Sequence, residues 1–251
     1  MLIFRSHSLC IKLAFIYISI LQIIIKMKIN SSIFLHLCLI FSLACTSANA
    51  NEIEQKFVAA GLVNVSDIDP TIQIDLVNSD PEKNFFREDY YSGLDKAYLQ
   101  EKVALQLAEA QKVLKKKHPS YSLQILDAAR PRSVSQAMYD KMKGTKFEKY
   151  VANPSKGSMH NFGIAVDLTI VDGDGNELDM GITPFNKSTI RIYWEYAKMK
   201  LGKKITRAQK QNRKLLSETM KQAGFLPLSF EWWHFNGMEK ELTRKHYKII
   251  E

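Results

Sequence analysis

Residues 158–167 read SMHNFGIAVD, and this stretch decides how we interpret the fold of the 251-residue chain. The segment Ile164–Val171 is rich in β-branched and other apolar side chains, which predicts a buried strand. Gly163 permits a tight turn before that strand. Asp167 would therefore project from the strand and His160 from the turn, so six residues separate two side chains that can ligate a metal.

A second metal-capable pair lies in residues 231–235, which read EWWHF. Catalytic zinc takes three protein ligands from His, Asp, Glu or Cys and leaves its fourth position to water. His160, Asp167 and His234 supply that number. Glu231, with two residues between it and His234, would lie beside the metal without ligating it and could act as the general base. The sequence therefore predicts a zinc hydrolase site, with the tandem tryptophans between the pair assigned to packing and pocket walls.

The first fifty residues differ from the rest of the chain. They contain all three cysteines, no acidic residue and two apolar stretches. From Met27 onward the layout is that of a secretory signal: a short basic region, an apolar run over Ile33–Leu43 and a small-x-small cleavage site at Ala48–Ala50. We expect residues 1–50 to be a targeting region, with the signal peptide at 27–50, and the mature chain to be exported to the periplasm or cell envelope.

Two alternatives concern the same region. The apolar run Leu13–Ile25 could be a transmembrane helix, but it is short for a bilayer span, and we favour an upstream start that is not used. Cys45 follows a sequence similar to the end of a lipoprotein signal, although Ser42 stands where leucine is usual. A lipid anchor at Cys45 is our second choice, so any membrane contact is expected only through the targeting segment or this anchor.

Residues 51–251 are expected to form one domain. Removing the first fifty residues takes away four basic residues and lowers the formal charge from +9 to +5. This mildly basic balance suits an anionic envelope, but it lacks the clustered Lys/Arg and aromatic residues of a nucleic-acid-binding surface. The segment contains no cysteine, so disulfides are not expected and stability must come from packing.

Patterns along this domain alternate between helix and strand. Helices are predicted at residues 98–118, 133–143, 189–200 and 206–223, and strands at 123–128, 164–171 and 225–235. The segment Asn78–Asp95 is predicted to be a surface loop near the site. The acidic segment 172–177 lacks the glycine that a calcium loop needs at its sixth position, since Glu177 is there, and is predicted to be a hairpin turn.

Three separated segments resemble the VanX-type D-alanyl-D-alanine dipeptidases, which belong to a zinc D,D-peptidase superfamily that includes D,D-carboxypeptidases and the hedgehog domain. They are Asp127–Pro131, which reads DAARP, the segment 158–167 and the segment 231–234. The resemblance implies an α+β fold in which a central antiparallel sheet, flanked by helices, carries one zinc ion on His160, Asp167 and His234. It also implies Glu231 as the base, Arg130 as the stabiliser of the transition state and Ser158 as a substrate-binding residue.

The chain departs from that family in two places. Where the family has an aspartate that holds the substrate amine, the corresponding segment is one residue longer and ends in Asn186. If Asn186 does not lie in the amine site, Asp179 or Glu195 is the alternative. The family's N-terminal tyrosine has no clear match, and Tyr90 or Tyr91 could replace it. Both changes could relax specificity for dipeptides.

The resemblance implies hydrolysis of D-alanyl-D-alanine in the cell envelope, linked to peptidoglycan turnover or D-alanine scavenging. An exported enzyme could not drain a cytosolic pool of the dipeptide, so a role in glycopeptide resistance is not expected. Two alternatives remain: a D,D-carboxypeptidase or endopeptidase acting on peptidoglycan peptides, and a non-catalytic binding module that keeps zinc structurally. Each candidate residue also has an ordinary structural explanation, such as a buried hydrogen-bonded histidine or a solvated glutamate. Six such explanations would have to coincide in chain order, so we favour the enzyme.

Overall fold

The computed structural model describes residues 52–84, 86–145, 148, 153–181, 205–229 and 231–251, which belong to one compact unit, Ala48–Glu251. The expected targeting region at 1–50 and the expected helix at 189–200 lie outside these residues. Within the described part of the chain, the helices are all too short or too polar to cross a membrane.

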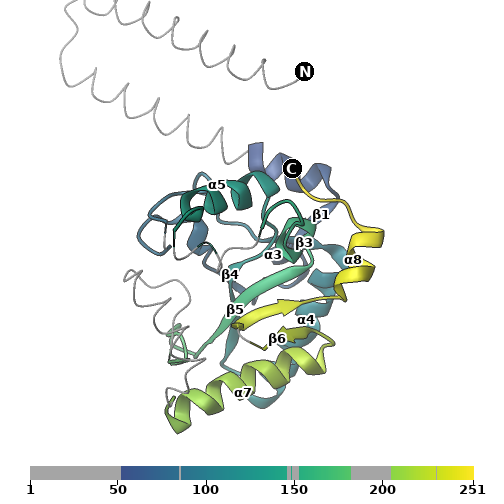
Figure 1. Ribbon diagram of the computed structural model, residues 1–251. Helices are drawn as coiled ribbons and strands as arrows, with labels where there is room; N and C mark the ends of the chain where they lie inside the picture. The colour runs from purple at the N-terminus through teal and green to yellow at the C-terminus, as the bar shows by residue number, and fades with distance from the viewer. Residues whose placement is uncertain (1–51, 85, 146–147, 149–152, 182–204, 230) are drawn as a thin grey trace, which may run out of the picture. The chain divides into compact units, whose positions relative to one another are not determined.

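A five-stranded sheet organises this unit, with strand order β2-β4-β5-β7-β6 (Figure 1). The strands are β2 (Gln73–Ile74), β4 (Ser122–Asp127), β5 (Ala165–Val171), β6 (Leu226–Leu228) and β7 (Glu231–Asn236). All neighbours are antiparallel except the β2–β4 pair, which is parallel. The expected α+β fold around a central antiparallel sheet is therefore confirmed, with one parallel strand added at its edge.

The remaining elements surround this sheet. The helices are α3 (Val65–Ile68), α4 (Glu101–Lys117), α5 (Arg132–Met142), α7 (Arg207–Gln222) and α8 (Lys240–His246), and residues 52–59 are also helical. The described residues also include the 3₁₀ turns η1 (Val77–Ser79) and η3 (Met159–Phe162) and a small antiparallel pair of β1 (Leu62–Asn64) with β3 (Tyr98–Gln100).

The two faces of the sheet differ in polarity. Cross-strand partners point to the same face, so the pairs Leu123–Ile170 and Ile125–Leu168 make one face apolar. These side chains are fully buried in the core that also includes Leu107 of α4. The opposite face carries Gln124, Asp127, Asp167 and Thr169 in the same two strands. One face therefore provides the core, and the other is available for polar chemistry.

Several local predictions are confirmed. Thr206 caps α7 through a reciprocal pair of hydrogen bonds with Gln209. The segment 172–177 is a hairpin turn in which the Asp172 carboxylate accepts hydrogen bonds from the backbone amides of Asp174 and Asn176. Gly163 ends η3 with φ +65°, and a Cβ there would lie 2.7 Å from Leu62 Cδ2. The turn before β5 therefore requires glycine for both its backbone angle and its close packing.

Three predictions need correction. The strand expected at 225–235 is a hairpin of β6 and β7, because residues 226–228 fold back and pair with β7. The helix expected from residue 98 begins at Glu101, since Tyr98–Gln100 pair with β1. The segment Asn78–Asp95 is irregular, as expected, but it is more than a surface loop, because it buries Asn84, Tyr91 and Leu94.

Candidate metal centre

Backbone groups of residues 128 and 130 contact both the ring and the main chain of His160. It lies in η3, and its Nδ1 is 2.7 Å from the carbonyl oxygen of Ala128, which follows β4. Nδ1 must donate in this contact because a carbonyl oxygen only accepts. The backbone of His160 in turn accepts a hydrogen bond from Arg130 N at 3.0 Å. The DAARP segment thus fixes the ring orientation of His160 and leaves Nε2 as the nitrogen with a free lone pair.

His234 is fixed in the same manner by a side chain of its own strand. Its Nε2 is 2.9 Å from Oδ1 of Asn236, which lies two residues further along β7 and therefore on the same face. Nε2 donates to this amide oxygen, so Nδ1 is left with the lone pair. His234 and Asn236 are buried, with 6% and 4% of their surfaces exposed, and solvent does not compete for the bond.

Asp167 completes the cluster from the middle strand. Cross-strand pairing places Asp127, Asp167 and His234 in one row across β4, β5 and β7. An irregularity in register between Ile125 and Asp127 brings Asp127 opposite Asp167. A second irregularity lets Leu228 pair with Glu231, although Pro227 pairs with Phe235. Such bulges re-aim side chains beside active sites, and both flank this one.

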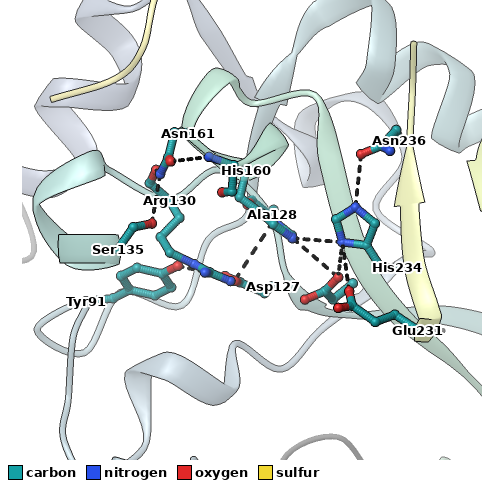
Figure 2. Close-up of polar contacts among 12 residues, drawn as sticks. Tyr91, Asp127, Ala128, Arg130, Ser135, His160, Asn161, Glu231, His234 and Asn236 are labelled. Atoms are coloured by element: carbon teal, nitrogen blue, oxygen red, sulfur yellow. Dashed lines mark hydrogen bonds and ion pairs between the residues drawn. The ribbon is translucent and has the colours of Figure 1, made fainter. Parts of the chain in front are cut away.

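The ligand atoms of His160, Asp167 and His234 all lie within 4.8 Å of one another. Figure 2 shows the two histidine rings side by side in this cluster. Asp167 Oδ1 is 2.9 Å from His234 Nδ1 and 3.3 Å from His160 Nε2, and the two nitrogens are 3.1 Å apart. Ligand atoms about 2.0–2.1 Å from a tetrahedral zinc ion would be about 3.3 Å apart, close to these separations. Three lone pairs at this distance repel one another unless a cation lies between them. The residues therefore fit a divalent metal.

The electrostatics of the cluster also favour a central positive charge. Burial alone would raise the pKa of Asp167, but the positive charge and hydrogen bond of His160, together with His234, hold it well below its usual range. Burial alone would lower the pKa of His234, but the hydrogen bond and negative charge of Asp167 raise it. Both directions follow from attraction between the Asp167 carboxylate and protonated imidazole, so this carboxylate favours positive charge at the centre of the cluster.

Glu231 lies beside the cluster without joining it. Its Oε2 is 3.8 Å from His234 Nδ1, and a third of its side-chain surface is exposed, whereas the three ligands are buried. Burial raises the pKa of Glu231, while the positive charge of His234 opposes this. A carboxylate with a raised pKa at the mouth of a metal site is suited to accept and return a proton.

Arg130 lies on the other side of His160, next to Asp127 and Tyr91 (Figure 2). Its Nε donates to Asp127 Oδ2 at 3.0 Å, and its Nη2 donates to the same oxygen. Burial opposes its charge, but Asp127 outweighs that effect and raises the pKa of the guanidinium further. Arg130 is therefore a permanent cation next to the candidate metal centre.

Ser158 precedes η3 and is partly buried. Its backbone amide donates to Asn161 Oδ1 at 2.7 Å, which is half of a capping box at the start of η3, and its hydroxyl oxygen is buried. Asn186 and Glu195 lie outside the described residues. Asp179, the other candidate for amine binding, accepts hydrogen bonds from Gly181 N and Gln209 Nε2 and so anchors its own loop to α7.

Sequence reasoning missed three groups that position this site. Asn236 could have been found from its two-residue spacing to His234. Asp127 was part of a motif but had no role, and its spacing of three residues before Arg130 was the available signal. The Ala128 carbonyl carries no sequence signal, because any residue supplies one. Of the two tyrosines considered, the structure brings Tyr91 to Asp127 with a hydrogen bond of 2.7 Å.

Comparisons with known proteins identify a family for this chain. A D-alanyl-D-alanine dipeptidase from Escherichia coli is 34% identical over 113 residues, 45% of this chain and 53% of that protein. One from Synechocystis is 27% identical over 180 residues (58% and 71%), and one from Enterococcus faecalis is 30% identical over 163 residues (59% and 76%). The chain thus spans about half the length of the first relative and more than two thirds of the others. The family model described as D-ala-D-ala dipeptidase matches residues 58–251, and the chain belongs to this family of metallopeptidases.

Proposed function

We propose that this chain is a zinc-dependent dipeptidase that hydrolyses D-alanyl-D-alanine. The observation that carries the proposal is the convergence of three ligand atoms, two of them on histidines whose other ring nitrogen is hydrogen-bonded to an oxygen, with a carboxylate beside them. Zinc is the metal of choice because two imidazoles and one carboxylate match its usual donors and leave a position open. Zinc bound to His160, Asp167 and His234 would polarise the scissile carbonyl and acidify water.

The protein residues around that centre divide the remaining work. Glu231 removes a proton from the attacking water and delivers one to the leaving amine, for which its raised pKa suits it. Arg130 pairs with the oxyanion that develops on the scissile carbonyl, and it needs no proton transfer to do so. Ser158, two residues before His160, would contact the substrate, as the resemblance to the family implies. A non-catalytic zinc module would have no use for Glu231 and Arg130 in these positions.

Substrate preference follows from the amine end. A free dipeptide carries an ammonium group at its amino end. The VanX-type family that this sequence resembles has a carboxylate for this group, whereas Asn186 offers only an amide oxygen. A charge-assisted hydrogen bond is about twice as strong as a neutral one, so this change weakens recognition of the free amine. It keeps open a second candidate, a D,D-carboxypeptidase or endopeptidase that acts on peptidoglycan peptides.

Release of D-alanine from D-alanyl-D-alanine, measured against release from a pentapeptide that ends in the same dipeptide, tests the proposal. A dipeptidase cleaves only the first substrate, a carboxypeptidase also cleaves the second, and a binding module cleaves neither. The variant Asn186→Asp adds a finer test. It should lower KM for the free dipeptide and leave or impair cleavage of peptides with a blocked amino end. An equal response of both substrates would place Asn186 away from the amine.

Location is a separate part of the proposal. The signal-like segment at 27–50 supports export to the periplasm or cell envelope, where the substrate would come from peptidoglycan turnover or serve D-alanine scavenging. Fractionation of cells that express the full chain, with amino-terminal sequencing of the product, tests this. Processing near Asn51 supports the signal peptide, and a lipid-modified Cys45 supports the anchor. Unprocessed, active protein in the cytosol would overturn the proposed location.

A further inference from the structure

Arg130 depends on one buried carboxylate for its orientation. Asp127 accepts hydrogen bonds from both Nε and Nη2 of the guanidinium, so it uses two of the five N–H donors of Arg130. The Asp127 side chain is fully buried, and the Arg130 side chain is 17% exposed. Solvent therefore screens this pair far less than a surface ion pair.

Asp127 is itself fixed from two directions. Its backbone is held opposite Asp167 by the register shift in β4. Its other carboxylate oxygen, Oδ1, accepts a hydrogen bond of 2.7 Å from the Tyr91 hydroxyl. Tyr91 is 1% exposed, and burial, followed by the negative charge of Asp127, raises the pKa of its phenol well above the usual value. Tyr91 therefore remains a hydrogen-bond donor and takes no part in proton transfer.

We propose that Tyr91 and Asp127 are positioning residues that hold the Arg130 guanidinium toward the candidate metal centre; this rests on the proposed role of Arg130 in stabilising the oxyanion. The side chains form a chain of contacts from the irregular segment 78–95, through β4, to the site (Figure 2). A free arginine side chain has about 2 kcal/mol of rotamer entropy, and a misplacement of about 1 Å can cost about a hundredfold in rate. A guanidinium that is fixed before the substrate binds avoids both the loss of rotamer entropy on binding and the rate cost of misplacement.

The contact has an opposite electrostatic effect that makes the proposal testable. The negative charge of Asp127 weakens the field that Arg130 exerts on a developing oxyanion. If orientation matters more, Asp127→Asn slows the reaction; if the field matters more, the same variant speeds it up. Orientation is the larger effect in this proposal, because a misplacement of about 1 Å can cost about a hundredfold in rate and Asp127→Asn loses the charge-assisted pair that holds the guanidinium.

The test compares Asp127→Asn, Tyr91→Phe and Arg130→Ala with the wild-type chain, all in the zinc-loaded protein. Loss of the charge-assisted pair in Asp127→Asn should lower kcat by about tenfold. Tyr91→Phe should lower kcat less, and both variants should show little change in KM or zinc content. Tyr98→Phe is the matched control, because Tyr98 also donates to a carboxylate, that of Glu54, away from the site. It should leave kcat unchanged.

A double-mutant cycle separates positioning from general damage to the fold. If Asp127 acts through Arg130, Asp127→Asn has no further effect on kcat in the Arg130→Ala background. Additive losses in the double variant, or a faster Asp127→Asn enzyme, would overturn the proposal. The conservative variant Asp127→Glu, which restores the charge on a longer side chain, should recover part of the loss.

A readout without substrate keeps this proposal distinct from the proposed function. The Nε–H group of Arg130 gives its own NMR signal, assigned by its loss in Arg130→Ala. It should exchange slowly with solvent in the wild-type protein and rapidly in Asp127→Asn. If the wild-type enzyme releases no D-alanine but this difference is present, the proposed function fails and the positioning contact stands. Equal exchange in both proteins refutes the positioning even in an active enzyme.

Discussion

The hydrogen bond between His234 and Asn236 should set the metal affinity of the site. When neutral His234 donates from Nε2 to Asn236, its Nδ1 carries the lone pair and faces the other ligands. The variant Asn236→Leu keeps the size of the side chain and removes its acceptor oxygen. His234 could then place its proton on Nδ1, where a protonated nitrogen cannot ligate a metal.

Two estimates give the size of this effect. Leaving a buried donor such as His234 Nε2–H without an acceptor costs about 1–3 kcal/mol. Removing the partner that orients a metal-ligating histidine lowers metal affinity by about 10–100-fold, or about 1.4–2.7 kcal/mol. Because Asn236 is only 4% exposed, water cannot readily replace its oxygen. We therefore expect Asn236→Leu to bind zinc about 10–100-fold more weakly than the wild-type chain.

Competition with a chromogenic chelator measures this difference directly. Asn236→Asp is the control, because it retains an acceptor at the same place and should bind zinc at least as tightly as the wild-type chain. Thermal unfolding of each metal-free protein checks that the fold survives. Equal zinc affinity in Asn236→Leu and the wild-type chain would refute the assigned roles of the two His234 nitrogens.

Three further predictions concern the same region. Glu231→Gln should keep one zinc per chain and lower kcat by about a hundredfold or more, because the proton carrier is removed but no ligand is; zinc loss in this variant would show that Glu231 is a ligand. As the pH is lowered, zinc affinity should begin to fall while the pH is still above 6.5, the ordinary pKa of histidine. Asp167 raises the pKa of His234, so protons compete with the metal at a higher pH, and a titration of affinity against pH measures this. Gly163→Ala should destabilise the fold by about 2–4 kcal/mol in denaturant unfolding, since it combines a positive φ with overlap onto Leu62, and a change below about 1 kcal/mol would contradict the packing.

Elements with strong periodicity could be predicted from sequence, and elements defined by their partners could not. The apolar runs of β4 and β5 and the amphipathic pattern of α4 agree with the structure to within a few residues. The β6–β7 hairpin was predicted as one strand because both of its arms are apolar and its turn lacks Gly, Asn or Asp. The short strands β1 and β2 were missed because pairing, more than composition, defines them.

The candidate site shows the same division. Metal-capable side chains have distinctive chemistry, so His160, Asp167 and His234 could be selected before their proximity was known, and the structure brings them together. Their supporting groups could not be selected in this way. Tyr91 reaches Asp127 across 36 residues of sequence, and a register shift in β4 sets where Asp127 lies. Such contacts depend on tertiary packing, which local patterns do not encode.

The central claim is that His160, Asp167 and His234 hold the metal on which the hydrolysis of D-alanyl-D-alanine depends. Its most direct test is a zinc titration of the metal-free chain, followed by D-alanine release. We predict that activity rises linearly and reaches a plateau at one zinc per chain, and that His234→Ala shows neither binding nor activity at the same zinc concentrations. Full activity in the metal-free protein, or an unchanged titration in His234→Ala, would contradict the account.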